Sequence, residues 1–202
     1  TGKRAAIPRG DRSGPPFRFV PPRGFRYSVA MLRTGIGYDS HRLADHRRLV
    51  LGGVEIPHSR GLAGHSDADV LIHALCDALL GAAAEGDIGQ MFPDTDPRWK
   101  GADSAAFLTA VIERLSRKGW SVANTDATVI TEAPRLQPHI PAMRARLAAL
   151  MGIEADRVSV KAKTNERMGA VGRREGISAM ALATIFRRAT GSGGRNECGD
   201  ES

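Results

Sequence analysis

Cysteine is scarce in this chain: Cys76 and Cys198 are the only two among 202 residues. They lie 122 positions apart and belong to no C-x-x-C pattern. This spacing argues against a disulfide framework and against a zinc site built from cysteines. Two isolated thiols fit a reducing compartment, so we expect a cytoplasmic protein.

Long hydrophobic runs are also missing. No stretch reaches the roughly 18 apolar residues that a membrane-spanning helix needs, and no short apolar segment follows a basic start as in a secretory signal. We therefore expect no membrane partner. The 202 residues, of which 42% are hydrophobic, can bury one sizeable core but hardly two, which predicts a single folded domain.

The net charge of +7 is confined to the first part of the chain. Residues 1–33 contain eight basic side chains and one acidic side chain, whereas residues 34–202 contain 21 of each. A nucleic-acid-binding module needs positive charge on its folded surface. We therefore expect no nucleic acid partner.

Both ends of the chain are predicted to be disordered. The basic leader, residues 1–32, contains two proline pairs that break any amphipathic helix. Its Arg-rich, acid-poor composition resembles an organellar transit peptide, which makes a plastid the alternative compartment. Residues 189–202 form a polar Gly/Ser tail without apolar periodicity. These limits leave residues 33–188 as the domain.

Between the tails, strand and helix patterns alternate along the chain. Short or alternating apolar runs predict strands at 33–41, 49–56 (interrupted by Gly52 and Gly53, which permit a turn or bulge), 120–130, 157–163 and 177–186. Helical periodicity predicts helices from Ser66 onward, at 104–118 and at about 138–151. The sum is an α+β, two-layer domain in which helices cover one face of a mixed four-stranded sheet.

The helix expected from Ser66 has a polar and an apolar side. Ser66 can cap its N-terminus, with Asp67 and Asp69 in the first turn complementing the helix dipole. Its apolar stripe consists of Leu71, Ala74, Leu75, Ala78, Leu79 and Ala82. His73 lies on the opposite side, one turn from both Asp69 and Asp77.

Asp39 and His41 lie two positions apart in the first predicted strand, so both side chains project from one face. With His73 they offer two nitrogens and one oxygen, a set that suits Zn²⁺ and leaves a fourth position for water or substrate. Asp77, four residues after His73, is expected to orient the imidazole as an outer acceptor. Spacing alone leaves a second interpretation open, in which His73 is a half-buried histidine and Asp39 a turn residue.

Three further polar clusters lie in short segments. The first contains Asp87, Asp94 and Asp96, which are either ligands for a cation or hydroxyl groups or Asx-turn residues. The second, TEAPRLQP at 131–138, follows a strand and can offer backbone groups to a base. The third contains Lys161, Lys163, Thr164 and Glu166. These residues combine cationic donors with a carboxylate, which is what binding a phosphate together with a hard cation requires. The alternative is that they form a solvated strand end.

In this order, the motifs resemble the 2-C-methyl-D-erythritol 2,4-cyclodiphosphate synthase family of the non-mevalonate isoprenoid pathway. The matching stretches are GIGYDSHRL, LGGVEIP, GLAGHSDADVLIHALCDALLGAAAEGDIGQMFPDTDP, KGADS, ITEAPRLQPHIPAMR, VSVKAKTNE and GRREGI. They cover about residues 33–188. The combination of Asp-x-His with His-Ser-Asp-x-Asp-x-x-x-His is highly specific and favours the metal site.

The resemblance implies a homotrimer with active sites between neighbouring subunits. Its substrate is a small cytidine diphosphate compound, 4-diphosphocytidyl-2-C-methyl-D-erythritol 2-phosphate, which is cyclised with release of CMP. By resemblance, Asp39, His41 and His73 bind Zn²⁺. Glu166 binds a second cation, Mg²⁺ or Mn²⁺, at the substrate diphosphate.

The resemblance also assigns substrate contacts. Catalytic roles fall to Glu166, Thr164 and His65. Contacts with the methylerythritol phosphate portion fall to His65, Ser66, Asp87, Gly89 and Asp94. Contacts with cytidine and diphosphate, from the adjoining subunit, fall to the range from Thr131 to Gln137, which includes Ala133, Pro134, Arg135 and Leu136, and to Lys163 and Thr164, with Arg173 as a phosphate partner.

The chain departs from the family pattern after Gly169. Many members have Phe there, whereas this chain has Ala170 and Val171, which counts against the isoprenoid phosphate cavity that relatives have on the trimer axis. Lys163 and Asn165 stand where many relatives have Thr.

The implied nucleophile is a phosphate monoester oxygen, which is already anionic at neutral pH. No strong general base is needed, and no Ser-His-Asp or Cys-His arrangement is evident in the sequence. A metal-dependent phosphohydrolase is the alternative, because zinc-bound water with a pKa near 7 is a competent nucleophile. The product distinguishes the two activities.

Overall fold

The structure, a computed structural model, describes residues 31–93, 95–99 and 101–187. The predicted disorder of the leader and the tail concerns residues outside these ranges, apart from Met31 and Leu32. These two residues begin the first strand, just before the expected start of the domain. None of the helices in the described ranges has the length and apolar composition that crossing a membrane requires.

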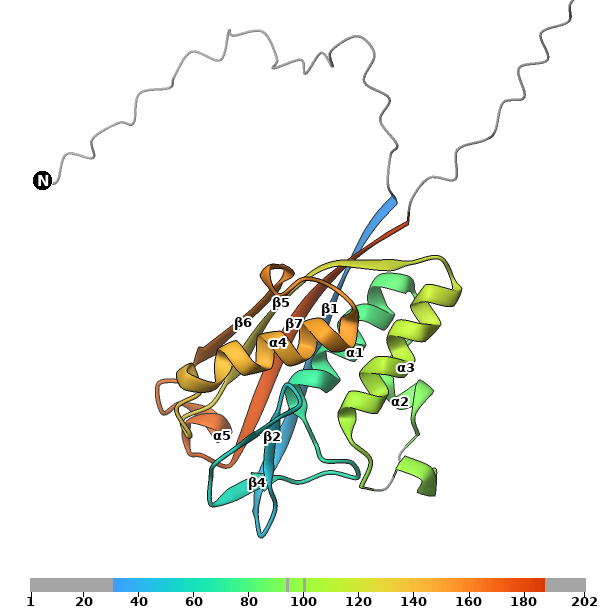
Figure 1. Cartoon of the computed structure of the whole chain (residues 1–202). Coiled ribbons are helices and arrows are strands. Elements are labelled where there is room, and N and C mark those ends of the chain that lie inside the picture. The colour runs from blue at the N-terminus through green and yellow to red at the C-terminus, as the bar shows by residue number, and fades with distance from the viewer. Residues whose placement is uncertain (1–30, 94, 100, 188–202) are drawn as a thin grey trace, which may run out of the picture.

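A five-stranded sheet forms one layer of the domain (Figure 1). Its order is β4-β1-β7-β5-β6, in which β5 and β6 are parallel and all other neighbours are antiparallel. The strands are β4 (Arg60–Leu62), β1 (Met31–Asp45), β7 (Gly176–Arg187), β5 (Ser121–Ile130) and β6 (Val158–Lys163). A mixed sheet is confirmed, but the predicted count of four strands is wrong because β4 adds a fifth.

β4 has too little sequence pattern of its own to be predicted. It contains three residues with Gly61 in the middle, and it pairs with the end of β1, where Leu43 faces Leu62 and Asp45 faces Arg60. β1 accordingly continues to Asp45, beyond its predicted end at residue 41. A strand this short depends on its partner rather than on the propensity of its residues.

The predicted strand at 49–56 is a hairpin of two short strands, β2 (Leu49–Leu51) and β3 (Val54–Ile56). Gly52 and Gly53 connect them with φ values of 62° and 70°. A two-residue turn of type I′ requires left-handed values at both positions, which glycine adopts without strain. The glycine pair therefore forms a turn, one of the two possibilities that the sequence allowed.

Three long helices lie over one face of the sheet (Figure 1). They are α1 (Val70–Ala83), α3 (Ser104–Arg117) and α4 (Ile140–Met151). α1 packs on β1 and β7, α4 on β6, and α3 against α1. The predicted helices at 104–118 and about 138–151 are confirmed; shorter elements are α2 (Ile88–Met91), α5 (Gly169–Gly172) and 3₁₀ turns at Pro97–Trp99, Gln137–His139 and Ala155–Arg157.

The start of α1 differs from the prediction. Ala68 has a φ of 58°, a left-handed conformation that an α-helix cannot include, so the helix does not begin at Ser66. Asp69 is the N-cap instead, and its carboxylate accepts hydrogen bonds from the backbone N–H groups of Leu71 and Ile72. Ser66 therefore belongs to the loop that precedes the helix.

Two glycines of β1 allow α1 to approach the sheet closely. A Cβ atom at Gly37 would lie 2.0 Å from the carbonyl oxygen of Ala74, and one at Gly35 would lie 2.2 Å from that of Ala78. Any side chain at these positions would push the helix away from the strand. The close approach brings side chains of β1 next to those of α1.

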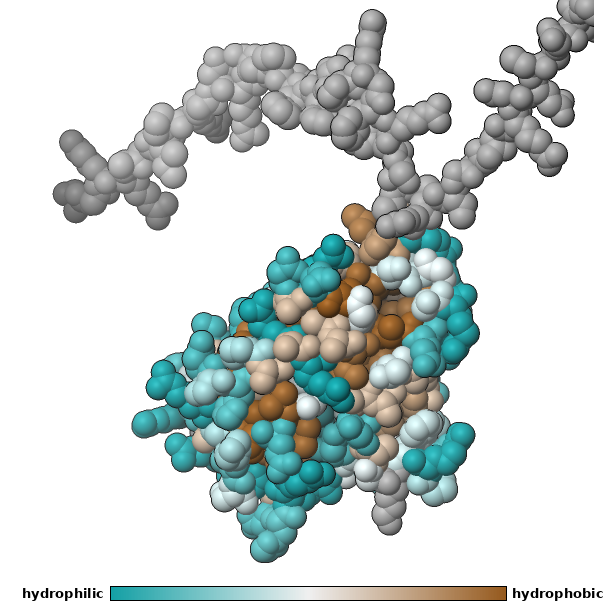
Figure 2. Space-filling model, viewed as in Figure 1, coloured by the Kyte–Doolittle hydropathy of each residue, from teal (hydrophilic) through white to brown (hydrophobic). Residues whose placement is uncertain are grey.

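The opposite face of β1 and β7 carries large apolar side chains. Ile36 is 63% exposed, Tyr38 58%, Met180 44% and Leu182 46%. Ile36 lies opposite Leu182 and Tyr38 opposite Met180, so the four form one patch, called here the outer sheet patch. Figure 2 shows the helix side, where hydrophobic residues gather between α3 and α4. The outer sheet patch is therefore a candidate interaction surface.

Candidate active site

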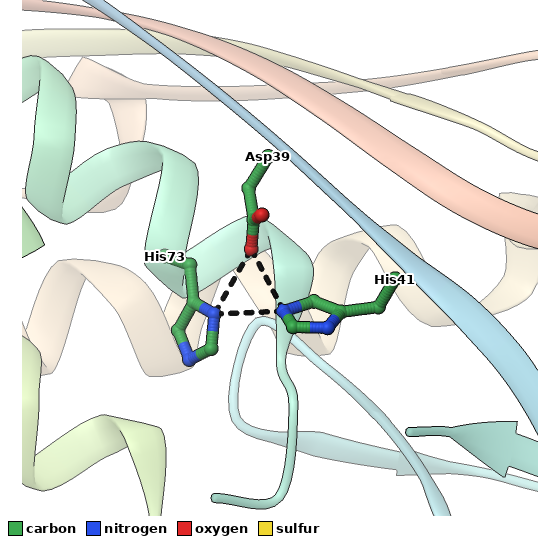
Figure 3. A group of neighbouring side chains, drawn as sticks. All are labelled: Asp39, His41 and His73. Carbon is green, nitrogen blue, oxygen red and sulfur yellow. Dashed lines mark hydrogen bonds and ion pairs between the residues drawn. The ribbon is translucent and has the colours of Figure 1, made fainter. Parts of the chain in front are cut away.

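Asp39, His41 and His73 meet where β1 and α1 lie close together (Figure 3). Oδ2 of Asp39 lies 2.9 Å from Nε2 of His41 and 2.9 Å from Nδ1 of His73. The two ring nitrogens lie 3.1 Å apart. The predicted convergence of these three residues is therefore confirmed.

Outer hydrogen bonds determine which ring nitrogens carry protons. Nδ1 of His41 lies 2.9 Å from the carbonyl oxygen of Ala63, which can only accept a hydrogen bond, so Nδ1 carries the proton. Nε2 of His73 lies 3.0 Å from Oγ of Ser104, whose own hydroxyl donates to the carboxylate of Asp67. In their neutral forms both rings therefore turn an unprotonated nitrogen toward Asp39.

Three electron-pair donors that face one point fit a cation. Donor atoms about 2.0–2.1 Å from a tetrahedral zinc ion lie about 3.3 Å from one another. The three distances here, 2.9, 2.9 and 3.1 Å, are slightly shorter than that edge. Two imidazoles and one carboxylate are also the ligand types that borderline divalent metals prefer. The residues present thus fit a bound metal ion.

The same contacts shift the acid–base behaviour of the ligands. Although burial opposes ionisation, the hydrogen bonds that His41 and His73 donate when these ring nitrogens are protonated hold the pKa of Asp39 well below its ordinary value. Burial also disfavours the charged form of His41, but the hydrogen bond with Asp39 outweighs it and raises the pKa of His41. A proton on His41 thus competes with a metal ion for the same nitrogen.

Asp77 does not have the predicted role of outer acceptor for His73. Its carboxylate accepts a hydrogen bond of 2.8 Å from the backbone N–H of Ile88, at the start of α2. Burial raises the pKa of Asp77 above its ordinary value. Spacing of four residues places Asp77 one turn from His73, but Nε2 of His73 points to Ser104 on α3. The sequence alone did not single out Ser104.

A cavity of about 170 Å³ opens beside the two histidines. Of the predicted substrate-contact residues, His65, Ser66 and Gly89 line it. Its apolar wall consists of Ile88, Phe92, Trp99 and Phe107. Phe92 stacks on Phe107 at 4.6 Å between ring centroids, and Trp99 meets both rings edge-on.

Of the two acidic residues expected near substrate hydroxyl groups, Asp87 lies within the described residues. Asp87 is the N-cap of α2, where its carboxylate accepts a hydrogen bond of 2.8 Å from the N–H of Gln90. It does not belong to the lining of the 170 Å³ cavity. Asp94 lies outside the described residues.

A second cavity, of about 270 Å³, lies where the parallel strands β5 and β6 end. Ala162 lines it, as do most of the predicted cytidine-contact residues: Thr131, Glu132, Pro134, Arg135, Leu136, Gln137, Lys163 and Thr164. Ala133 is outside the lining, and its carbonyl oxygen accepts a hydrogen bond from the Thr131 hydroxyl. The two cavities share no lining residue.

Glu166 follows the second cavity in a loop with left-handed backbone geometry. Its φ is 48°, and its Oε1 accepts a hydrogen bond of 2.7 Å from the Thr164 hydroxyl. The backbone N–H groups on either side of Glu166 donate to the carboxylate of Glu132. Arg173 is paired with Glu175 at 2.6 Å on the surface.

Comparisons with known proteins agree with this arrangement. The sequence profile described as the YgbB family matches residues 32–186. A 2-C-methyl-D-erythritol 2,4-cyclodiphosphate synthase from Burkholderia thailandensis is 59% identical over 157 residues, which are 78% of this chain and 97% of that protein. A solved structure of such a synthase in a CDP-bound form is 39% identical with a TM-score of 0.71, over 76% of this chain and 99% of that one. The IspF–CDP complex from Plasmodium falciparum is 29% identical with a TM-score of 0.68, over 78% and 97%.

Proposed function

The chain belongs to the YgbB family, and we infer from this that it catalyses the cyclodiphosphate synthase reaction of the non-mevalonate isoprenoid pathway. In that reaction, 4-diphosphocytidyl-2-C-methyl-D-erythritol 2-phosphate gives 2-C-methyl-D-erythritol 2,4-cyclodiphosphate and CMP. The structural observation that carries the inference is the convergence of Asp39, His41 and His73 beside the 170 Å³ cavity. A phosphohydrolase is not favoured, because the relatives that match nearly their full length are synthases.

The metal ligands and the residues that line the 170 Å³ cavity are proposed to have different roles in the reaction. Asp39, His41 and His73 would hold Zn²⁺, which when bound acts as a Lewis acid on a phosphoryl oxygen. Ser66 and His65 line the cavity next to these ligands and supply hydrogen-bond donors for phosphate oxygens. The aromatic wall excludes water, which strengthens charge interactions inside the cavity.

The methylerythritol portion is proposed to lie in this cavity, against Ser66 and Gly89. Asp87 and Asp94 remain proposed contacts for its hydroxyl groups, by resemblance. The nucleotide end is proposed to occupy the 270 Å³ cavity, against Thr131 to Leu136, Lys163 and Thr164. CDP-bound structures of relatives support a nucleotide ligand.

Glu166 and Thr164 are proposed to act at the diphosphate. The Glu166 carboxylate is a suitable ligand for Mg²⁺ or Mn²⁺, which prefer oxygen donors. The hydrogen bond from Thr164 fixes that carboxylate. Arg173 would have to leave its exposed pair with Glu175 to reach a phosphate, at little cost because exposed ion pairs contribute little stability.

The resemblance implies a homotrimer with active sites between subunits, and two features of the chain support such self-association. The outer sheet patch exposes four large apolar side chains that a second copy would cover. The 170 Å³ cavity beside the metal ligands and the 270 Å³ cavity proposed for the nucleotide share no lining residue. A substrate that needs both cavities can therefore bind where two copies of the chain bring them together. The buried free thiol of Cys76 is compatible with the cytoplasm as the proposed compartment.

The proposed reaction needs positioning rather than a strong base. The attacking phosphate oxygen is already anionic at neutral pH, so the protein has to hold it in line with the β phosphorus and the departing CMP. Holding the nucleophile on the same molecule gives an effective concentration of about 10⁵ M or more. Attack by the tethered phosphate is therefore expected to outcompete attack by water.

A ³¹P NMR assay with the diphosphocytidyl 2-phosphate substrate tests the proposal. The expected products are a ring diphosphate with two coupled resonances and one equivalent of CMP, without inorganic phosphate. The same protein treated with a chelator is the control and should leave the substrate unchanged. Inorganic phosphate or an open-chain product would instead support the phosphohydrolase.

A further inference from the structure

Ser104 connects a metal ligand to a half-buried carboxylate, that of Asp67. Its Oγ lies 3.0 Å from Nε2 of His73, and its hydroxyl donates to Oδ1 of Asp67 through a short hydrogen bond. Ser104 is fully buried. A serine hydroxyl has one proton, and a carboxylate can only accept, so the proton lies toward Asp67. The oxygen of Ser104 therefore faces His73 as an acceptor.

The position of Asp67 is itself fixed by the backbone. Oδ1 accepts a further hydrogen bond of 3.2 Å from the N–H of Asp69, and Oδ2 accepts one of 3.2 Å from the N–H of Ser104. The N–H of Asp67 donates to the carbonyl oxygen of Ala102 at 3.0 Å. Asp67 thus joins the loop before α1 to the first residue of α3, and this geometry leaves its carboxylate no alternative orientation that satisfies all three donors.

From these contacts we propose that Asp67 and Ser104 are positioning residues for the metal site. Asp67 orients the Ser104 hydroxyl, the oxygen of Ser104 accepts a hydrogen bond from the Nε2–H of His73, and His73 then presents Nδ1 as an unprotonated metal ligand. Reversal of the Ser104 hydroxyl would place the proton on Nδ1 and remove the ligand. The Ser66 hydroxyl also lies near Nε2, at 3.3 Å, but Ser104 is closer, at 3.0 Å, and only the Ser104 hydroxyl is hydrogen-bonded to Asp67 among these two serines.

The proposal rests on the metal site described under the proposed function, but it makes a separate claim about a ring tautomer. Asp67→Asn is the most direct test, because an amide turns an N–H₂ group either toward the Ser104 hydroxyl or toward the Ser104 N–H. Ser104→Ala removes the acceptor and keeps the backbone contact with Asp67. Asp103→Asn is the matched control, since Asp103 is the N-cap of α3 and asparagine caps helices equally well.

Two measurements distinguish the outcomes: the tautomer of His73 in the metal-free proteins, and the affinity of each protein for Co²⁺ in a titration. In the metal-free wild type and in Asp103→Asn, ¹⁵N NMR of labelled histidine at a pH where His73 is neutral should show Nε2–H for His73. In Asp67→Asn and Ser104→Ala the Nδ1–H form should appear. Removal of such outer contacts typically weakens metal affinity about 10–100-fold, and the same loss is expected for Co²⁺.

An unchanged tautomer together with unchanged Co²⁺ affinity in both variants would overturn the proposal. Ser104→Ala keeps the test interpretable if Asp67→Asn does not fold, because Ser104→Ala removes one hydroxyl group and leaves every backbone hydrogen bond of α3 in place. If the wild type itself binds no Co²⁺, the metal site fails. If the wild type binds Co²⁺ and the variants match it, only the positioning role fails.

Discussion

Asp69 joins the β2–β3 hairpin to the helix that carries His73, and its replacement should be costly. The side chain is fully buried. Its carboxylate accepts four backbone hydrogen bonds, from Gly52 at 2.9 Å, Gly53 at 2.6 Å, and Leu71 and Ile72 at 3.1 Å each. Two donors belong to the turn of the hairpin and two to the first turn of α1.

Asp69→Ala leaves these four N–H groups without their acceptor. A buried donor that loses its partner costs about 1–3 kcal/mol, and the loss of a helix cap about 1 kcal/mol. Since these costs overlap, we expect the free energy of unfolding to fall by about 3–6 kcal/mol, a large share of the 5–15 kcal/mol typical of domains. Asp69→Asn can keep its oxygen on the N–H groups of Gly52, Leu71 and Ile72, but its N–H₂ group then faces the N–H of Gly53, so about 2 kcal/mol is expected.

The pH dependence adds a second expectation. Burial raises the pKa of Asp69 to about 6, above the ordinary value of 3.8 expected in the unfolded chain. The folded protein thus holds this proton more tightly, and the resulting stabilisation is complete below pH 3.8 and is lost as the pH rises through about 6. The stability difference between wild type and Asp69→Ala should therefore be larger at pH 4 than at pH 7.

Urea unfolding followed by tryptophan fluorescence measures both expectations, at one fixed protein concentration. Trp120 is buried and reports on the core. A loss below about 1 kcal/mol for Asp69→Ala at pH 7 would refute the accounting of hydrogen bonds. A stability difference that is equal at pH 4 and pH 7 would refute the raised pKa.

Four further outcomes are expected. His73→Ala should lose bound zinc and nearly all turnover while the oligomer persists, and full zinc content by metal analysis would remove the assignment. Glu166→Gln should leave zinc in place but demand more Mg²⁺ or Mn²⁺, so an unchanged cation titration would count against its role. Because the pKa of His41 is raised, Co²⁺ affinity should decline as the pH falls through that pKa, whereas a flat profile would contradict proton competition. Leu182→Glu should place a charge in the outer sheet patch and give smaller species by sedimentation, and an intact oligomer would argue against that interface.

Local periodicity indicated that the three side chains of the metal site could meet, whereas the resemblance of the surrounding motifs was needed to favour a metal over the alternative interpretation. Asp39 and His41 share one face of a strand through their spacing of two, and His73 lies on the polar side of an amphipathic segment. The orienting partner of His73 could not be found in this way. Spacing of four suggested Asp77, but Ser104 reaches the ring from α3, and only the packing of α3 on α1 brings the two together.

The misplaced start of α1 has a similar origin. Ser66 has the side chain of an N-cap, and Asp69 has one as well, so composition allowed both positions. The turn of the hairpin decides between them, because its two glycine N–H groups require the Asp69 carboxylate at a fixed place. The segment before Asp69 then remains a loop, which frees Ser66 to line the cavity and Asp67 to contact Ser104.

β1 shows how the site and the proposed oligomer depend on the same residues. A sheet with helices on one face ordinarily turns its large apolar side chains toward the helices. Here the small Gly35 and Gly37 face α1, because the close approach of the helix leaves no room for a Cβ atom. Ile36 and Tyr38 consequently face outward, where burial against another surface would be favourable. The closeness that brings His73 to Asp39 thus gives this strand a second apolar face, which we propose is the one that a second copy of the chain covers.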